Sequence, residues 1–374
     1  MRVAIVHEWL TNLAGSERVV LALARLFPGA PVYTSVHDPA RLGPAFAHLD
    51  VRETFLGRVP GARRRHQLLL PFLPLAFEQL DMRGYDLVLC SHHACAHGVI
   101  ADARALTVAY VHTPMRYAWS MAPDYQATLP AAARLATAPL LHALRMWDRA
   151  ASQRVDRYVA NSREVAGRIR RCWGREAEVV APPVRVGDFA GGLARDPGEH
   201  FLVVSRLVPY KRVELAVAAA KAAKRSLRVV GDGPLYKQLR RAAGPETTFL
   251  GTLTDAEVRA EYAACRALLF PGLEDFGIVP VEAMASGRPV IAYGRGGALD
   301  TVVPGVSGWL VGDQTAEAFA AAMRRAEAEP LAPAAIARHA ALFDEAAFDA
   351  RLGAMIAHWY AEHVEAPRPT PTAV

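Results

Sequence analysis

Two glutamates, Glu274 and Glu282, mark the segment whose residue types and spacing point most clearly to chemistry. An apolar strand is expected to end near Pro271, and a short helix to run from about Val279 to a cap at Gly287. Glu274 then lies in the loop before the helix, and Glu282 lies in its first turn. Both carboxylates can face the crevice beyond the carboxyl end of the strand, where open α/β sheets bind ligands.

Backbone amides add a second kind of group to this segment. The helix start exposes them at the positive end of the helix dipole, which is a ready anion site; they belong to Phe276, Gly277, Ile278 and Val279. Carboxylates beside such amides suit a ligand that is part phosphate and part polyol. Two glutamates at this spacing also arise by chance among 37 acidic residues, so the interpretation depends on the strand, loop and helix around them.

A basic pair follows the first strand of the second half of the chain. Arg206 and Lys211 come directly after the apolar run 201–204. Two cations at the carboxyl end of a strand favour a visiting anion, although a solvated basic loop has the same composition. Gly231-Asp232 and the segment around Leu250 offer two further loops on this side, but an Asp-Gly pair is a common turn.

The first half supplies candidates at its own strand ends. Gly15 follows the first strand and opens a helix, without the G-x-G-x-x-G of a dinucleotide site. His112 ends a later strand. The residues after it could form a polar and aromatic shelf for a second substrate; they are Arg116, Tyr117 and Trp119. A lone histidine is more often structural than catalytic, so His112 alone decides little.

The segment 90–97 holds two cysteines and three histidines. Such residues can bind zinc, but no strong spacing such as C-x2-C is present. We therefore expect a strand-to-helix loop at the crevice, with His92 or His93 near substrate, and no metal.

Strands alternate with helices along the whole chain, which predicts parallel sheets. The pattern restarts after a Pro- and Gly-rich linker at 181–198. The fold class is therefore α/β, with two Rossmann-like domains in tandem. We assign 1–184 to the first domain, 199–340 to the second, 341–361 to a last helix, and 362–374 to a disordered tail.

Composition limits the remaining possibilities. The 374 residues are 52% hydrophobic and 21% charged, as in an ordinary globular protein. The longest apolar run, 68–77, is about half the ~20 residues of a membrane span, and His7 and Glu8 come too early for a signal peptide. We expect a cytoplasmic protein. Its four cysteines suggest no disulfide framework, and its net charge of +6 permits anionic partners.

The Glu274–Glu282 segment resembles the E-x7-E signature of retaining GT-B glycosyltransferases, in particular family 4 (glycosyl transferases group 1). In that family the first glutamate contacts donor sugar hydroxyls and the second binds the nucleotide ribose. Arg206 and Lys211 resemble the Arg-x4-Lys element that holds the donor diphosphate. The resemblance also places Gly15, Gly231, Asp232 and Leu250 near the donor, and His112 beside its sugar, while His93 joins the acceptor candidates.

The resemblance implies a GT-B fold, with two domains facing a central crevice and the last helix crossing back to the first domain. It implies transfer of a hexose with retention, without a metal or cofactor. Arg206, Lys211 and the helix amides would stabilise the leaving diphosphate. No protein nucleophile is then obligatory.

Donor and acceptor follow from a narrower similarity. His7-Glu-Trp-Leu and the segment 112–117 are similar to bacterial O-antigen and exopolysaccharide enzymes, including mannosyltransferases that use GDP-mannose. A UDP-hexose or UDP-N-acetylhexosamine is the alternative donor, and a nucleotide-sugar 2-epimerase or a basic nucleic-acid-binding protein are remote ones. Related enzymes often act on lipid-linked acceptors. Arg63, Arg64 and Arg65 beside the apolar run therefore favour contact with an anionic membrane surface over a core helix with a basic cap.

Overall fold

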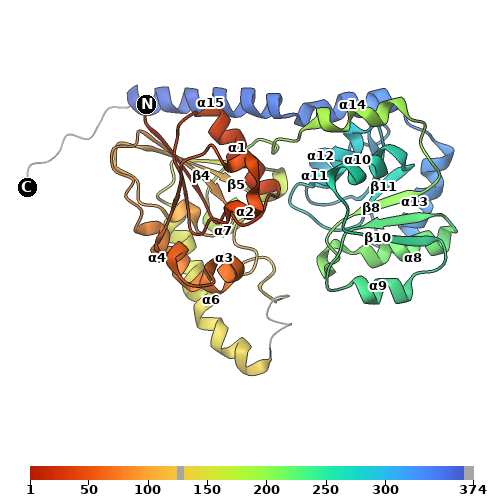
Figure 1. Cartoon of the computed structure of the whole chain (residues 1–374), viewed down its shortest axis with the longest axis horizontal. Coiled ribbons are helices and arrows are strands. Elements are labelled where there is room, and N and C mark those ends of the chain that lie inside the picture. Colours follow the sequence, from red (N-terminus) through yellow and green to blue (C-terminus); the bar gives the residue numbers. More distant parts are fainter. Residues whose placement is uncertain (124–129, 366–374) are drawn as a thin grey trace, which may run out of the picture. The chain divides into compact units, whose positions relative to one another are not determined.

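The computed structural model describes residues 1–123 and 130–365, which form two compact units. Unit 1 comprises Met1–Asn161, Val165–Ala181 and the chain from Phe348 on, and unit 2 comprises Ser162–Glu164 and Pro182–Ala347. Each unit is built on one parallel sheet, with helices packed on both of its faces (Figure 1). The predicted α/β class with two Rossmann-like domains is confirmed.

Unit 1 contains a seven-stranded sheet in the order β3-β2-β1-β4-β5-β6-β7. Its strands are β1 Val3–His7, β2 Val32–Thr34, β3 Val51–Glu53, β4 Leu87–His92, β5 Leu106–Val111, β6 Arg157–Ala160 and β7 Glu178–Val179. Every adjacent pair is parallel. The chain moves outward from β1 to β3 and then returns to β4, so β1 and β4 border the point where the strand order reverses.

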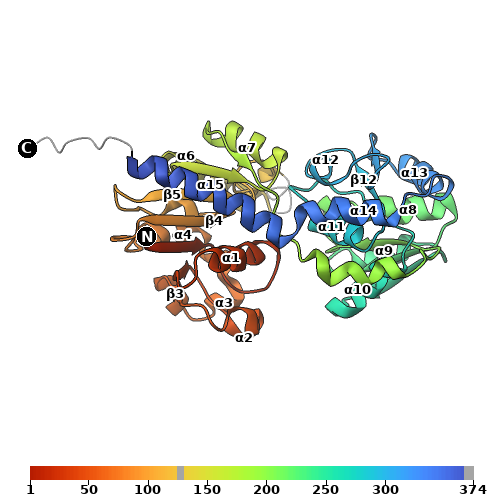
Figure 2. The same ribbon diagram turned by 90° about the horizontal axis from the view of Figure 1, so that it is seen from above.

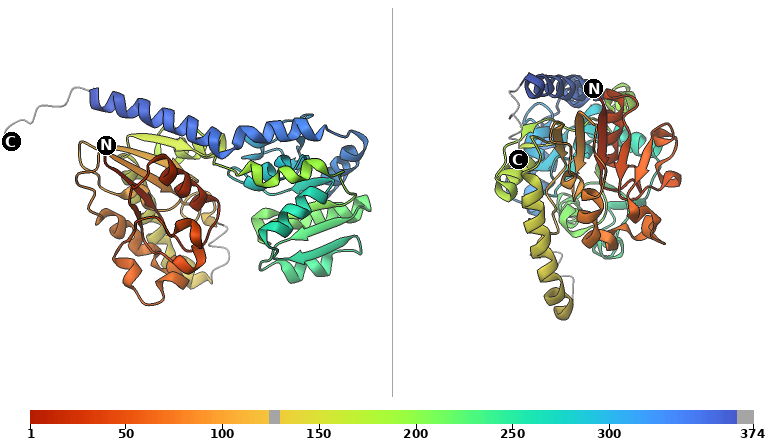
Figure 3. Two further views of the ribbon diagram at one scale, coloured as in Figure 1. Left: turned by 45° about the horizontal axis from the view of Figure 1, so that its top comes forward. Right: turned by 90° about the vertical axis from the view of Figure 1, so that its left-hand side faces the viewer.

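Side chains alternate between the two faces of this sheet, as strand geometry requires. Ile5 and Leu89 belong to a core under the helices α1 (Gly15–Leu26) and α15 (Glu345–Glu365). Val6 and Cys90, one position along each strand, belong to the core of the opposite face. That face is covered by the helices α4 (Leu73–Glu78), α6 (Ala131–Ser152) and α7 (Arg163–Trp173). Figures 2 and 3 show α15 and α1 running over the same face of the sheet.

The last helix is longer than the sequence suggests. It continues past the expected end at residue 361 to Glu365, where Glu362 accepts from Arg157 and His363 Nε2 lies 3.1 Å from the carbonyl oxygen of Arg104. Residues 362–365, assigned to a disordered tail, are therefore helical, and 366–374 lie outside the described residues. Short helices of unit 1 include α2 Pro39–Leu42, α3 Ala62–Arg65 and the 3-10 helix η3 His66–Phe72.

Unit 2 has a six-stranded sheet in the order β10-β9-β8-β11-β12-β13. Its strands are β8 Phe201–Val204, β9 Leu227–Val230, β10 Thr247–Gly251, β11 Ala267–Phe270, β12 Val290–Tyr293 and β13 Gly308–Val311. Its helices are α8 Val213–Ala223, α9 Tyr236–Ala242, α10 Asp255–Ala264, α11 Ile278–Ala285, α12 Ala298–Thr301, α13 Ala316–Ala328 and α14 Pro333–Ala340. The segment around Leu250, expected as a loop, is the end of strand β10.

Candidate functional site

The predicted donor residues of unit 2 gather at the reversal point of its sheet. The chain runs from β8 outward to β10 and then returns to β11, which pairs directly with β8. The loop after β8 carries Arg206 and Lys211, and the loop after β11 carries Glu274. Open α/β sheets bind ligands at this position, beyond the carboxyl ends of the strands.

Lys211 and Glu274 form an ion pair across this edge, with Nζ of Lys211 donating to Oε1 of Glu274. The two side chains are 18% and 17% exposed, so the pair can be reached by a ligand. Gly272 makes the approach possible, because a Cβ on it would lie 3.0 Å from Cα of Lys211. Arg206 is exposed on the same loop as Lys211, directly after β8.

The loop before α11 is held in place by close backbone packing. Gly297 N donates to the carbonyl of Glu274 over 2.8 Å, and a Cβ on Gly297 would lie 2.3 Å from Cα of Phe276. Gly277 caps α11 in a left-handed conformation with a φ of 93°. Glycine adopts such a conformation at little cost, so the chain can turn here and start the helix at Ile278.

Glu282 does not lie in the first turn of α11, as the sequence suggested. The helix starts at Ile278, one residue before the expected Val279, which places Glu282 in its second turn. Tyr262 on α10 donates its hydroxyl to Oε2 of Glu282 over 2.9 Å. The expected helix cap is present, because Gly287 follows the helix with a φ of 72°.

The two weaker donor loops also end at this edge of the sheet. Gly231 directly follows β9, and its N–H donates to the carbonyl of Gly251 at the end of β10. Asp232 is exposed, while its carbonyl accepts from Leu207 N over 2.9 Å. Unit 2 therefore places its predicted cations, carboxylates and helix amides at one edge, a combination suited to a ligand with phosphate and hydroxyl groups.

His112 in unit 1 directly follows β5 and is half-buried. Its Nε2 lies 2.9 Å from Oγ of Ser91. Burial lowers the pKa of His112 well below its ordinary value, and the neighbouring His93, His7 and His92 lower it further. The ring is therefore neutral at physiological pH.

His93, a predicted acceptor residue, belongs to a cluster of rings beside His112. Its ring centroid lies 4.7 Å from that of Trp9 and 6.1 Å from that of His112. Burial lowers the pKa of His93 to about 4, although the Glu8 carboxylate opposes this shift. The histidine can contact a substrate as a neutral ring, and its acceptor role stays a prediction.

Among the residues after His112 that were predicted to contact an acceptor, Trp119 is held in place by a hydrogen bond. Trp119 donates its indole N–H to Oδ2 of Asp148 over 2.8 Å, and Trp173 donates to the same oxygen over 2.6 Å. The polar end of Trp119 is thus bound to the protein interior and its ring packs against the core of unit 1, so its acceptor role stays a prediction. Arg116 and Tyr117 are half-buried in the same segment.

Sequence reasoning missed several buried polar residues around these histidines. Glu8 is fully buried and accepts hydrogen bonds of 2.7–3.0 Å from the backbone N–H groups of residues 93–96. Burial alone would raise the pKa of Glu8, but His92 and His93 and the backbone bonds lower it well below the ordinary value. The signal in the sequence is the polar pair His7-Glu8 directly after an apolar run.

A second buried group contains His92, His97 and Asp148, whose ligand atoms lie within 4.8 Å of one another. The two imidazole rings are stacked, with centroids 3.9 Å apart and planes 9° apart. Because the nitrogen lone pairs lie in the ring planes, stacked rings do not direct them at one ion. His97 Nε2 instead lies 3.0 Å from Oδ1 of Asp148. That the chain needs no metal remains a prediction.

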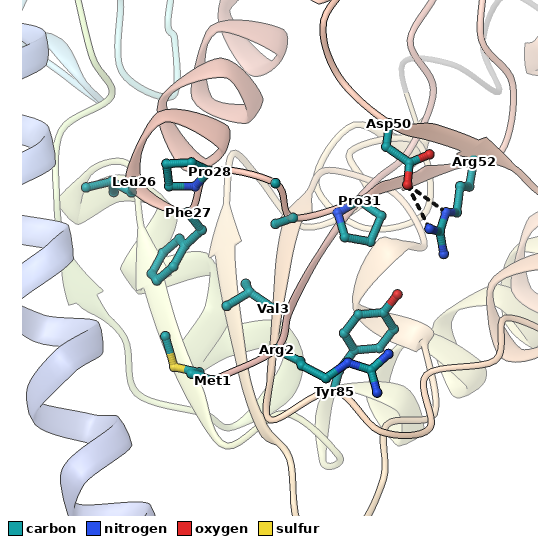
Figure 4. Close-up of a pocket in the computed structure, with 12 residues that line it drawn as sticks. Met1, Arg2, Val3, Leu26, Phe27, Pro28, Pro31, Asp50, Arg52 and Tyr85 are labelled. Atoms are coloured by element: carbon teal, nitrogen blue, oxygen red, sulfur yellow. Dashed lines mark hydrogen bonds and ion pairs between the residues drawn. The ribbon is translucent and has the colours of Figure 1, made fainter.

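A cavity of about 460 Å³ lies at the amino ends of the unit 1 strands, away from the strand ends that carry the histidines (Figure 4). The starts of the first strands line it, together with the end of α1 and Tyr85. The ion pair between Arg52 and Asp50, with Nη2 2.7 Å from Oδ2, lies beside it. None of the predicted site residues lines this cavity.

Two family models match consecutive parts of the chain. The model of Glycosyltransferase Family 4 matches residues 13–187, and that of Glycosyl transferases group 1 matches residues 188–342. Together they include all but two short ends of the chain. Gly15 and His112 fall in the first match, and the predicted donor residues of unit 2 fall in the second.

Individual proteins show the same similarity. A GDP-mannose-dependent alpha-mannosyltransferase of Mycolicibacterium smegmatis is 36% identical over 176 residues, which are 44% of this chain and 46% of that protein. A protein of the same name from Mycobacterium tuberculosis is 29% identical over 261 residues, 68% of each chain. The chain thus spans about half of the first relative and two thirds of the second.

The fold is shared with solved structures as well. Anabaena Alr3699/HepE, crystallised in complex with UDP and glucose, superposes with a TM-score of 0.68 at 18% identity, over 96% of this chain and 99% of that one. At this identity the likeness concerns the GT-B fold alone. With the two consecutive family matches, it establishes that the chain is a GT-B glycosyltransferase of glycosyltransferase family 4, glycosyl transferases group 1.

Proposed function

We propose that this enzyme transfers mannose from GDP-mannose to a hydroxyl of a saccharide acceptor, with retention at the anomeric carbon. The observation that carries the proposal is the juxtaposition of Lys211, Glu274 and the start of α11 at the reversal point of the unit 2 sheet. The choice of GDP-mannose is supported by the names of the two mannosyltransferases above.

The ion pair gives the donor site a defined first step. A diphosphate carries more negative charge than one carboxylate, so it competes for Lys211 and releases Glu274. The free carboxylate can then accept hydrogen bonds from sugar hydroxyls. Arg206, Lys211 and the amides at Ile278 and Val279 would stabilise the charge on the leaving diphosphate, which a metal supplies in other transferases.

Glu282 takes a different role in this proposal. Tyr262 donates to its Oε2 and orients the carboxylate, which would accept from the ribose hydroxyls of the nucleotide. Glu274 and Glu282 are then not the acid and nucleophile of a retaining glycosidase, because such a pair flanks one glycosidic bond at about 5 Å. His112, as a neutral ring, contacts the donor sugar in this scheme.

An anionic lipid surface is the proposed partner of the region 62–78, which supports a lipid-linked acceptor. Leu68, Phe72 and Leu75 are 70%, 55% and 51% exposed there, beside the exposed Arg63–Arg65. No helix in the described residues has the length and apolar character needed to cross a membrane. Contact would therefore be peripheral, and co-sedimentation with anionic vesicles, weakened in Arg64→Glu, tests it.

The donor is tested by thermal unfolding of the protein with GDP, UDP, ADP and dTDP, followed by the matching nucleotide-sugars. A ligand that binds only the folded state adds RT ln(1 + [L]/Kd) to its stability, about 2.7 kcal/mol at a hundredfold excess over Kd. We expect stabilisation by GDP and GDP-mannose. Stabilisation by UDP alone would replace the donor with the UDP-sugar alternative.

A variant tests the role of Glu274. Thermal unfolding measures its GDP binding, and a separate turnover assay measures mannosyl transfer. Glu274→Gln should retain GDP binding and lose mannosyl transfer, because the carboxylate contacts the sugar and not the base. Glu329→Gln removes a more exposed carboxylate of the same unit and should change neither. Full transfer by Glu274→Gln would contradict the sugar-contact role, and conversion of GDP-mannose without any acceptor would favour the epimerase.

A further inference from the structure

A chain of polar side chains crosses three neighbouring strands of unit 1 and ends at His112. It starts at Glu17 on α1, whose Oε1 lies 3.8 Å from Nε2 of His7 at the end of β1. His7 Nδ1 lies 3.1 Å from both the carbonyl oxygen and the Oγ of Ser91 on β4. Ser91 Oγ then lies 2.9 Å from His112 Nε2. Glu17, His7 and Ser91 are all buried.

Strand register brings these residues together. His7 is the direct partner of Ser91 in the β1–β4 pair, and Ser91 is the partner of Tyr110, near the end of β5, in the β4–β5 pair. The backbone of His112 is held on both sides, because its N–H donates to His92 O over 2.8 Å and its carbonyl accepts from Asn161 Nδ2 over 3.0 Å. The imidazole therefore meets the Ser91 hydroxyl from a fixed backbone.

The direction of the hydrogen bonds follows from one group. A backbone carbonyl can only accept, so the His7 nitrogen that faces Ser91 O carries the proton. His7 Nδ1–H then also faces Ser91 Oγ as a donor, and the hydroxyl hydrogen is free to point at His112. With the Ser91 hydroxyl as donor to His112 Nε2, the proton of the neutral His112 ring sits on Nδ1.

We propose that His7 and Ser91 are positioning residues that hold His112 as its Nδ1–H tautomer, so that the ring presents an N–H donor to an oxygen of the bound sugar. The role of His112 toward the sugar rests on the proposed function; the tautomer itself does not.

The charged and titratable groups around His112 agree with a neutral ring. His7 from β1, His92 and His93 from the end of β4 and Glu8 after β1 all face it. Three of these are imidazoles that disfavour a further positive charge, and Glu8 is saturated by backbone N–H groups. A neutral ring needs one N–H and one bare nitrogen, and Ser91 decides which nitrogen is bare.

The direct test is the ring tautomer of His112 in the full-length protein without ligand, read from two-bond 1H–15N correlation spectra of labelled histidines. The His112→Gln variant identifies its signals. We expect the Nδ1–H pattern in the wild type and loss of that pattern in Ser91→Ala. An Nε2–H pattern in the wild type overturns the proposal whatever the donor proves to be.

Turnover gives a second readout once a donor is known. Ser91→Ala should lower kcat by on the order of 10- to 100-fold, at the lower end of what proton-bearing groups contribute, with the donor KM changed far less. Ser91→Thr keeps a hydroxyl and should recover much of the loss. Ser152→Ala is the matched control, because Ser152 is a fully buried serine of the same unit whose hydroxyl donates to Arg149 O.

The outcomes separate the two proposals. If Ser91→Ala loses only as much thermal stability as Ser152→Ala and keeps both the tautomer and kcat, Ser91 is merely structural and the inference fails. If the tautomer responds to Ser91 but no nucleotide-sugar binds or reacts, the proposed function fails and the positioning role stands.

Discussion

At the scale of single residues, glycine decides how closely the donor loops can approach one another. Gly231 has a φ of 122°, and a Cβ on it would lie 1.9 Å from the carbonyl oxygen of Ser205. Gly231→Ala must therefore displace the loop that carries Arg206. We expect GDP binding to weaken by on the order of 10-fold or more, since strain of about 1–3 kcal/mol falls on the site.

Gly305→Ala is the control for this change. Gly305 also has a left-handed φ, 75°, but nothing lies within 4 Å of an added Cβ. The alanine in Gly305→Ala must adopt an unfavourable left-handed φ but collides with no neighbouring atom. The variant should therefore lose about 1 kcal/mol of stability and keep its GDP affinity. Calorimetric titration and thermal unfolding measure both quantities. Equal losses of affinity in the two variants would mean that the collision is irrelevant.

Residue types predicted which side chains gather at the strand ends of unit 2 better than they predicted the polar interior of unit 1. Lys211 and Glu274 meet as their positions after neighbouring strands suggested. Glu282 lies one residue further into its helix than expected, because Gly277 lets the chain turn and the helix starts at Ile278. The contacts of Ser91 with His7 and His112 depend on the register of β1, β4 and β5, and spacing along the chain does not encode that register.

At the scale of elements, strands with continuous apolar runs were predicted within one or two residues, as β8 at Phe201–Val204 shows. Elements with weak patterns were missed. β7 has two residues, and α13 (Ala316–Ala328) is so rich in alanine that its buried side gives little contrast with its exposed side. Tertiary contacts, not local preference, stabilise such elements.

The docking of α15 on unit 1 leads to a prediction about this element. Leu352 is 1% exposed in the core shared by α1 and α15. Leu352→Ala should lower the free energy of unfolding by about 2–5 kcal/mol, because it leaves a cavity. Asp349 on the same helix pairs with the partly exposed Arg25, with Oδ2 2.6 Å from Nε, and Asp349→Ala should cost less than about 1 kcal/mol.

Urea unfolding followed by tryptophan fluorescence compares these two variants, and Trp359 on α15 reports from the helix itself. A smaller shift of the midpoint for Leu352→Ala than for Asp349→Ala would mean that surface pairing, not apolar packing, holds the helix. The proposed GDP binding by unit 2 provides a folding control, since neither residue belongs to that unit.

At the scale of the whole molecule, the stability of the fold is linked to pH through the buried histidines of unit 1. Burial lowers the pKa of His93 and of His97 from 6.5 to about 4, and lowers that of His112 well below its ordinary value. In the unfolded chain these rings take up protons as the pH falls below about 6.5, whereas in the folded protein they do not. The unfolded state thus binds more protons in this range, so acid favours it.

The stability contributed by these rings is therefore fully present above pH 6.5 and lost as the pH falls toward 4. Each ring contributes up to about 1.4 kcal/mol per pH unit, so the free energy of unfolding should decrease steeply between pH 6.5 and 4.5.

Thermal midpoints measured across this range test the sign of this change. Replacing His48 with Gln should leave the dependence of the thermal midpoint on pH unchanged, because the His48 ring is exposed in the folded protein. A midpoint that stays level from pH 7 to 5 would show that the buried histidines are protonated in the folded state, and it would contradict the neutral His112 on which the proposed positioning role depends.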